Sequence, residues 1–95
     1  MTAYVIYQGD VFDPVQYEKY KTEGARSIAA AGGRYIVRGG TVDVLEGDAP
    51  AGRVVILEFP TRQAALDWYH GDDYTEVRKL REGAARARMF VVDGV

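Results

Sequence analysis

Residues 53–70 constrain the fold more than any other part of the sequence, because they combine a strand signal and a helix signal without a break. Residues 53–60 form a mainly apolar run with a single carboxylate, Glu58. Neither alternate set of side chains in this run is polar throughout, which is typical of a strand buried on both faces. Thr61 then supplies a helix cap, and apolar residues recur at helical spacing up to about His70. The segment predicts a buried strand followed directly by a helix.

Helix boundaries elsewhere are marked by capping residues and glycines. Asp13-Pro14 favours the start of a helix, and Gly32-Gly33 favours its end by supplying a left-handed residue. Asp73 and Glu76 predict a second capping box, at which the later helix restarts. The expected elements are strands at 3–8, 34–38, 41–46, 53–59 and 88–92, with a bend or bulge at Gly39-Gly40, and helices at 14–31, 61–70 and 74–82.

The order β-α-β-β-α-β over 95 residues predicts the ferredoxin-like α+β fold, a four-stranded antiparallel sheet with the helices on one face. A chain of this length is expected to form one domain, residues 1–95. The two strands expected at the centre of the sheet, 3–8 and 53–59, are apolar on both faces. In a monomer their helix-free side would expose an apolar patch on the order of several hundred Å². We therefore expect a second copy to cover it, which gives a homodimer.

Composition argues against several classes of function. The net charge is -2 and the arginines are scattered, so we expect no nucleic acid partner. The absence of cysteine excludes thiolate chemistry and cysteine zinc sites, and a single histidine argues against a transition-metal site. No phosphate-binding glycine loop is present. We expect no metal, no cofactor and no membrane contact, and a cytoplasmic location, since no targeting signal or membrane-length apolar run is visible.

A set of residues spread along the chain carries a resemblance to a known family. They are Asp13-Pro14, Tyr17, Tyr20, Gly32-Gly33-Arg34-Tyr35, Arg38-Gly39-Gly40, Leu45-Glu46-Gly47, Val55-Ile56-Leu57-Glu58-Phe59-Pro60, Ala65, Tyr74 and Leu80-Arg81. Taken together, they resemble the DUF1330 family, within the dimeric α+β-barrel group, over nearly the whole chain. The resemblance implies the ferredoxin-like fold and a dimer. It implies no single reaction, because that group includes cofactor-independent monooxygenases, isomerases, haem enzymes and ligand binders.

Glu58 and His70 are the candidate catalytic residues. A carboxylate inside an apolar strand loses hydration, so its pKa rises unless it is paired, and an unpaired Glu58 could act as a general base. The alternative is an ion pair, with Arg34 or Arg38 on the neighbouring strand, or Arg78 or Arg81 on a helix, as the partner. We expect this pair, at the edge of a pocket. His70 is the natural acid or base near neutral pH, but its polar surroundings favour a surface position.

The chain also offers residues that could hold a planar, anionic organic molecule. Arg78 and Arg81 are expected one helical turn apart and suit a carboxylate on such a ligand, and tyrosine hydroxyls suit the wall of a cavity. The candidate substrate-binding residues are Tyr20, Arg38, Glu46, Tyr74, Arg78 and Arg81. Three functions stay open on the sequence: a cofactor-free enzyme acting on such a metabolite, a binding module that uses the same cavity without turnover, and a purely structural homodimer.

Overall fold

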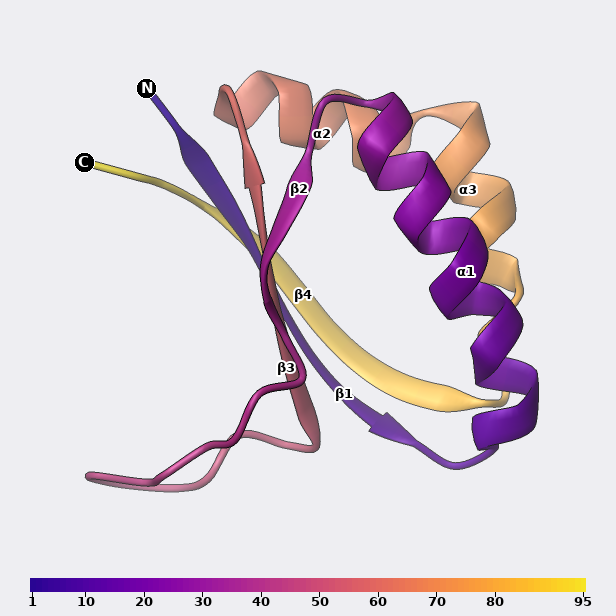
Figure 1. Cartoon of the computed structure of the whole chain (residues 1–95), viewed down its shortest axis with the longest axis vertical. Coiled ribbons are helices and arrows are strands. Elements are labelled where there is room, and N and C mark those ends of the chain that lie inside the picture. Colours follow the sequence, from indigo (N-terminus) through magenta and orange to yellow (C-terminus); the bar gives the residue numbers. More distant parts are fainter.

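The computed structural model describes all 95 residues of the chain. A four-stranded antiparallel sheet in the order β2-β3-β1-β4 carries the helices on one face (Figure 1). The elements are β1 (Ala3–Val11), α1 (Pro14–Ala30), β2 (Arg34–Arg38), β3 (Arg53–Phe59), α2 (Arg62–His70), α3 (Asp72–Lys79) and β4 (Ala85–Asp93). Because α2 and α3 together form the second crossover, the predicted β-α-β-β-α-β order and ferredoxin-like α+β fold are confirmed. No helix combines the length and the apolar character that a membrane span requires.

The first two helices begin where their capping residues predict. The Asp13 carboxylate accepts a hydrogen bond from the backbone N–H of Gln16 at 3.1 Å, with Pro14 in the first turn. The Thr61 hydroxyl accepts from the backbone N–H of Ala64 at 3.0 Å. At the end of α1, Gly32 adopts the left-handed conformation with φ of 83°, so the predicted helix end is confirmed.

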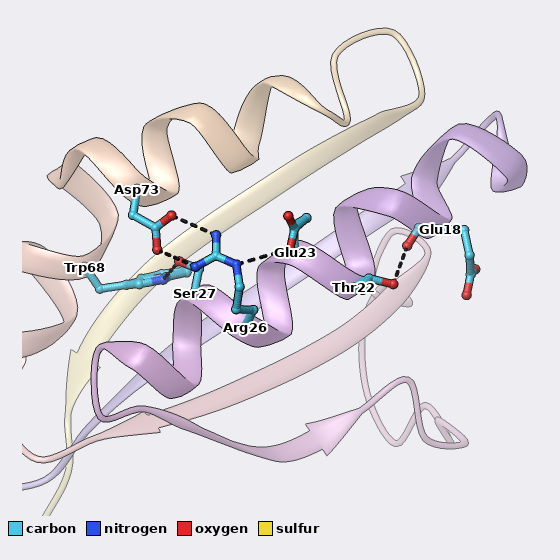
Figure 2. Close-up of polar contacts among 7 residues, drawn as sticks. All are labelled: Glu18, Thr22, Glu23, Arg26, Ser27, Trp68 and Asp73. Carbon is cyan, nitrogen blue, oxygen red and sulfur yellow. Dashed lines mark hydrogen bonds and ion pairs between the residues drawn. The ribbon is translucent and has the colours of Figure 1, made fainter.

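The start of α3 differs from the prediction. No side chain caps this helix, and the expected capping box at Asp73 is wrong. Asp73 instead accepts two hydrogen bonds from the Arg26 guanidinium of α1, at 3.1 and 2.8 Å (Figure 2). A bidentate pair with an arginine is stronger than a single bond to a backbone amide, and it ties α3 to α1.

Three predicted strands also differ in extent. β1 continues to Val11, three residues beyond the expected end at 8. β4 begins at Ala85, three residues before the expected start at 88, because Ala85 and Ala87 pair with Val11 and Gly9 of β1. The segment 41–46 forms no strand at all, although its apolar residues alternate. Gly39 has φ of 71° and turns the chain away from β3, so the segment has no neighbour to pair with. Residues 39–52, called the arm below, project away from the helices (Figure 1).

A β-bulge in β2 decides which side chains face the helices. Tyr35 pairs with Leu57, but the next pair joins Val37 to Ile56, so one residue of β2 is extra. After the bulge Arg38 pairs with the buried Val55 and shares its helix-covered face. The expectation that Arg34 and Arg38 share one face of the strand is therefore wrong.

The two faces of the sheet have different surroundings. The helix-covered face supplies the core together with aromatic residues of the helices, among them Tyr17, Tyr20, Trp68 and Tyr74. The helix-free face is also largely apolar but has no cover within the chain. Its exposed hydrophobic residues are Ile36 (43%), Phe90 (52%) and Val92 (45%). The two-sided apolarity predicted for the strands is confirmed.

Candidate functional site

A pocket lies between α1 and the helix-covered face of the sheet. Twelve residues line it, nine of them hydrophobic, and its volume is about 40 Å³. Four tyrosines form part of the wall: Tyr7, Tyr17, Tyr20 and Tyr35. Three cationic side chains also line it: Lys21, Arg38 and Arg53. No carboxylate, histidine or cysteine is among the lining residues, so the pocket has a positive character.

The tyrosine hydroxyls are connected in pairs across the fold. The hydroxyl of Tyr7 on β1 lies 2.6 Å from that of Tyr17 on α1. One turn further along α1, the hydroxyl of Tyr20 lies 2.7 Å from that of Tyr74 on α3. The Tyr17 and Tyr20 rings also contact each other, with centroids 5.2 Å apart. The pairs therefore join the sheet, α1 and α3 through buried polar atoms that would otherwise lack partners.

The hydroxyls of Tyr17, Tyr20 and Tyr74 stay protonated near neutral pH. Burial raises the pKa of Tyr17, and its contact with Tyr7 raises it further. Burial likewise raises the pKa of Tyr20 and of Tyr74. Removing a phenol from water disfavours its charged form. The hydroxyls can therefore donate hydrogen bonds to a ligand, but they cannot serve as bases at neutral pH.

Arg81 lies against this tyrosine group. Its guanidinium carbon is 5.9 Å from the Tyr7 ring centroid and 5.4 Å from that of Tyr20, within cation–π range. Burial lowers the pKa of Arg81, but interactions with Tyr20 and Tyr74 outweigh it and the pKa is raised. Its Nε is buried and has no hydrogen-bond partner. Arg81 therefore places a permanent positive charge against the rings of Tyr7 and Tyr20, and its Nε–H donates no hydrogen bond.

The tryptophan of α2 completes the aromatic wall. Trp68 lines the pocket, and its ring centroid lies 4.2 Å from that of Tyr74. Its indole Nε1–H donates to the hydroxyl of Ser27 on α1 at 3.0 Å (Figure 2). Both residues are buried, so this bond fixes the orientation of the indole.

The structure brings four of the predicted binding residues together. Tyr20 and Arg38 line the pocket, while Tyr74 and Arg81 contact its tyrosines. Arg78 does not line the pocket, but its guanidinium carbon lies 4.5 Å from the Tyr69 ring centroid and 5.8 Å from that of Tyr74.

The remaining predicted site residues lie away from the pocket. Glu46 is exposed in the arm. His70 is exposed at the end of α2, with its ring against that of Tyr69. Neither residue lines the pocket.

Glu58 is paired, but on the other side of the sheet. The Arg34 Nε donates to its carboxylate at 2.9 Å, which confirms the predicted ion pair with an arginine. The pair lies on the helix-free face, because the neighbouring Leu57 and Phe59 point into the core and Glu58 alternates with them. The expectation that it borders a pocket is wrong, since Glu58 is not among the lining residues.

Several pocket residues were not selected from the sequence. Tyr7 and Tyr17 are not among the candidate binding residues, and the hydroxyl pair between them is visible only in the structure. Arg53 and Lys21 carried no sequence signal, because an arginine at a strand start and a lysine on a helix are common surface residues. Their place at the pocket depends on the tertiary fold.

Comparisons with solved structures place this fold among proteins of several descriptions. The RPA0582 protein of unknown function from Rhodopseudomonas palustris has a TM-score of 0.74 at 19% identity, covering 99% of this chain and 82% of that chain. SnoaB, a cofactor-independent oxygenase from Streptomyces nogalater, has a TM-score of 0.71 at 12% identity, with 99% and 93% covered. A putative antibiotic biosynthesis monooxygenase from Nitrosomonas europaea has a TM-score of 0.59 at 13% identity, with 99% and 89% covered.

These identities are low, so the likeness concerns the fold alone. No curated protein matches the sequence. The family comparison is more specific, because it covers almost the entire chain. The domain of unknown function DUF1330 matches residues 2–95, and the chain therefore belongs to the DUF1330 family.

Proposed function

We propose that the protein is a homodimer that binds a small planar organic anion in the pocket between α1 and the sheet. The observation that carries this proposal is the composition of the pocket wall. Aromatic rings, tyrosine hydroxyls and three cations line it, with no carboxylate among them. Rings suit a planar ligand, and arginine and tyrosine donors suit its carboxylate or phenolate oxygens.

Arg38 and Arg53 are the proposed anchors of the anion. The Arg38 guanidinium lies 4.3 Å from the Tyr35 ring centroid, which leaves its N–H edge free to contact a ligand. The volume of about 40 Å³ accommodates a carboxylate group. A ring attached to that group would extend toward the aromatic side chains of the wall, among them Tyr35 and Trp68.

Binding is supported better than turnover. Catalysis by proton removal needs a group with a pKa near neutral pH that reaches the ligand. Tyr17, Tyr20 and Tyr35 have raised pKa values. Glu58 and His70 lie outside the pocket. The pocket thus holds donors and positive charge without a proton acceptor.

The homodimer is proposed from the helix-free face. Its exposed Ile36, Phe90 and Val92 adjoin the half-buried Ile6 and Ile56 of the central strands. An apolar surface of this kind, spread over all four strands, is typical of an interface rather than of a solvated face. A second copy offers the same surface and can cover it about a two-fold axis.

Ligand titration tests the binding proposal. Benzoate and salicylate, with neutral benzamide for comparison, are titrated while the fluorescence of Trp68 in the pocket wall is followed. We expect saturable binding of the anions, weakened at least about 10-fold in Arg38→Gln and in Arg53→Gln. Arg62→Gln is the matched control, because Arg62 is exposed and pairs with Asp93 outside the pocket. Absence of saturable anion binding, or equal affinities in all three variants, would overturn the proposal.

Light scattering tests the dimer separately. The parent protein is expected to be dimeric at micromolar concentration, and Ile56→Asp is expected to dissociate it by placing a charge on the apolar face. A monomeric parent would overturn the dimer without affecting the test of ligand binding.

A further inference from the structure

The arm between β2 and β3 is an exposed segment that combines apolar and acidic residues. Leu45 is 93% exposed, and Val42 and Val44 are about half exposed. The arm carries three acidic residues and no basic one: Asp43, Glu46 and Asp48. None of these carboxylates has an ion-pair partner within the chain. In a single chain the arm therefore exposes apolar side chains and carries carboxylates that no basic side chain neutralises.

The opposite edge of the sheet carries a complementary surface. Arg86 and Arg88 are exposed on the helix-free face of β4 and have no ion-pair partner. The Arg86 guanidinium lies 6.0 Å from the ring centroid of Phe12, which is 61% exposed. These three residues, Phe12, Arg86 and Arg88, are called the basic patch below. The patch pairs positive charge with an exposed ring, as the arm pairs negative charge with exposed aliphatic groups.

The strand register places the arm and the basic patch at the same end of the sheet. β3 starts at Arg53, opposite Gly9 of β1, and Arg86 lies opposite Asp10 of β1. Within one chain the two surfaces belong to opposite edges, since the strand order is β2-β3-β1-β4. The arm also leaves the sheet on the side away from the helices (Figure 1). It is therefore directed toward whatever covers the helix-free face.

We propose that the arm of each protomer packs on the basic patch of a second copy, so that its carboxylates meet Arg86 and Arg88 of the partner subunit. This inference rests on the proposed homodimer and specifies its two-fold axis. An axis parallel to the strands lays the β2 edge of one sheet over the β4 edge of the other while keeping like ends together. That arrangement brings the arm of each protomer onto the basic patch of the other, so the contact occurs twice in the dimer.

The alternative face-to-face axis, perpendicular to the strands, is disfavoured by charge. It would invert the ends of the sheet and place each arm near the Arg34–Glu58 pair, which is already neutral. It would also lay Arg86 and Arg88 over the apolar end of the partner's β4, where their charges would be desolvated without a partner. Only the axis parallel to the strands places the carboxylates of the arm against the arginines of the basic patch.

Charge reversal followed by mixing tests the proposal. The first variant reverses the arm (Asp43→Lys, Glu46→Lys) and the second reverses the patch (Arg86→Glu, Arg88→Glu). Each variant alone should self-associate at least about 10-fold more weakly than the parent, because like charges then face each other twice. An equimolar mixture should form heterodimers preferentially, because both of its contacts pair opposite charges. Analytical ultracentrifugation measures the dissociation constants, and native mass spectrometry counts the mixed species.

Controls separate this inference from the dimer itself. Lys19→Glu with Lys79→Glu changes the net charge as the patch variant does, but on exposed positions of α1 and α3, and should dimerise like the parent. Added salt should reduce the differences among the variants. If the parent is a dimer and both charge-reversed variants dimerise as tightly as the parent does, the arm contact is wrong and the homodimer stands. Weakened variants that show no preference for each other in the mixture would also overturn it. A monomeric parent would overturn the homodimer and the arm contact together.

Discussion

Ser27→Ala is the most direct test of how the aromatic wall of the pocket is held. Ser27 and Trp68 are buried, and the indole N–H donates to the serine hydroxyl at 3.0 Å (Figure 2). Alanine keeps the helix and nearly the same volume but removes the acceptor. The indole N–H is then left without a partner in the interior.

The expected loss of stability follows from that stranded donor. An unsatisfied buried donor costs about 1–3 kcal/mol. The higher helix propensity of alanine relative to serine offsets about 0.5 kcal/mol of this loss in the free energy of unfolding. A net loss near 1.5 kcal/mol should lower the melting temperature by roughly 6–12 °C for a domain of this size.

The single tryptophan of the chain makes the assay specific. Urea unfolding followed by Trp68 fluorescence reports the free energy of unfolding of Ser27→Ala, at one protein concentration because association affects stability. Thr22→Ala is the matched control on α1, since its exposed hydroxyl donates only to the Glu18 carbonyl at 3.2 Å (Figure 2). The control should be as stable as the parent. Equal stabilities of Ser27→Ala and Thr22→Ala would refute the reasoning.

Three other changes test the frame around the pocket. Asp13→Ala removes the cap of α1 and should lower the free energy of unfolding by about 1 kcal/mol in denaturant titration; an unchanged value would show that the cap is dispensable. Gly33→Val places a side chain where the Phe59 ring lies, 2.6 Å from an added Cβ, so its melting temperature should fall further than that of Asp13→Ala; a smaller fall would mean that the ring can move. Hydrogen bonds from Arg26 hold the pKa of Asp73 below its usual value, so the stabilisation is present at neutral pH and is lost as the pH falls through the acidic range. Arg26→Gln should therefore lose less stability than the parent on acidification, as measured by melts at several pH values, and a parallel acid response would contradict this linkage.

Local signals in the sequence predicted the helix boundaries. The caps at Asp13 and Thr61 and the left-handed Gly32 depend only on neighbouring residues, so they were found where the structure has them. Asp73 shows the limit of such signals. The residues around Asp73 suit a helix cap. Its carboxylate instead accepts two hydrogen bonds from Arg26, which is distant in the sequence and so invisible to a local pattern.

The pocket was only partly predictable, because its composition depends on strand pairing. One extra residue in β2 turns Arg38 to the helix-covered face, and neither its presence nor its place is visible in the alternation of apolar residues. Glu58 was singled out correctly as a paired carboxylate. Its face was not predictable, since both faces of β3 are apolar and periodicity alone cannot distinguish them. The hydroxyl pair between Tyr20 and Tyr74 joins residues 54 positions apart, beyond the range of any local pattern.

Glu58→Gln distinguishes a covered helix-free face from a solvated one. In a single chain the Arg34 side chain is 70% exposed and that of Glu58 is 25% exposed, so in water their pair contributes little. Beneath a second copy, the same change would leave the guanidinium of Arg34 without its partner and away from water, which is costly. The variant should therefore fold like the parent when dilute and monomeric, yet dimerise at least about 10-fold more weakly.

Sedimentation over a range of protein concentrations measures the dissociation constant, and urea unfolding of a dilute sample measures the stability of the monomer. Glu76→Gln is the matched control, because Glu76 forms an equally short pair of 2.9 Å with Lys79 on the exposed surface of α3. It should change neither folding nor association. If Glu58→Gln and Glu76→Gln dimerise like the parent, the Arg34–Glu58 pair stays in water and a second copy does not cover that end of the sheet. If Glu58→Gln instead destabilises the dilute monomer, the Arg34–Glu58 pair stabilises the fold of a single chain. The inference from its exposure that it contributes little would then be wrong.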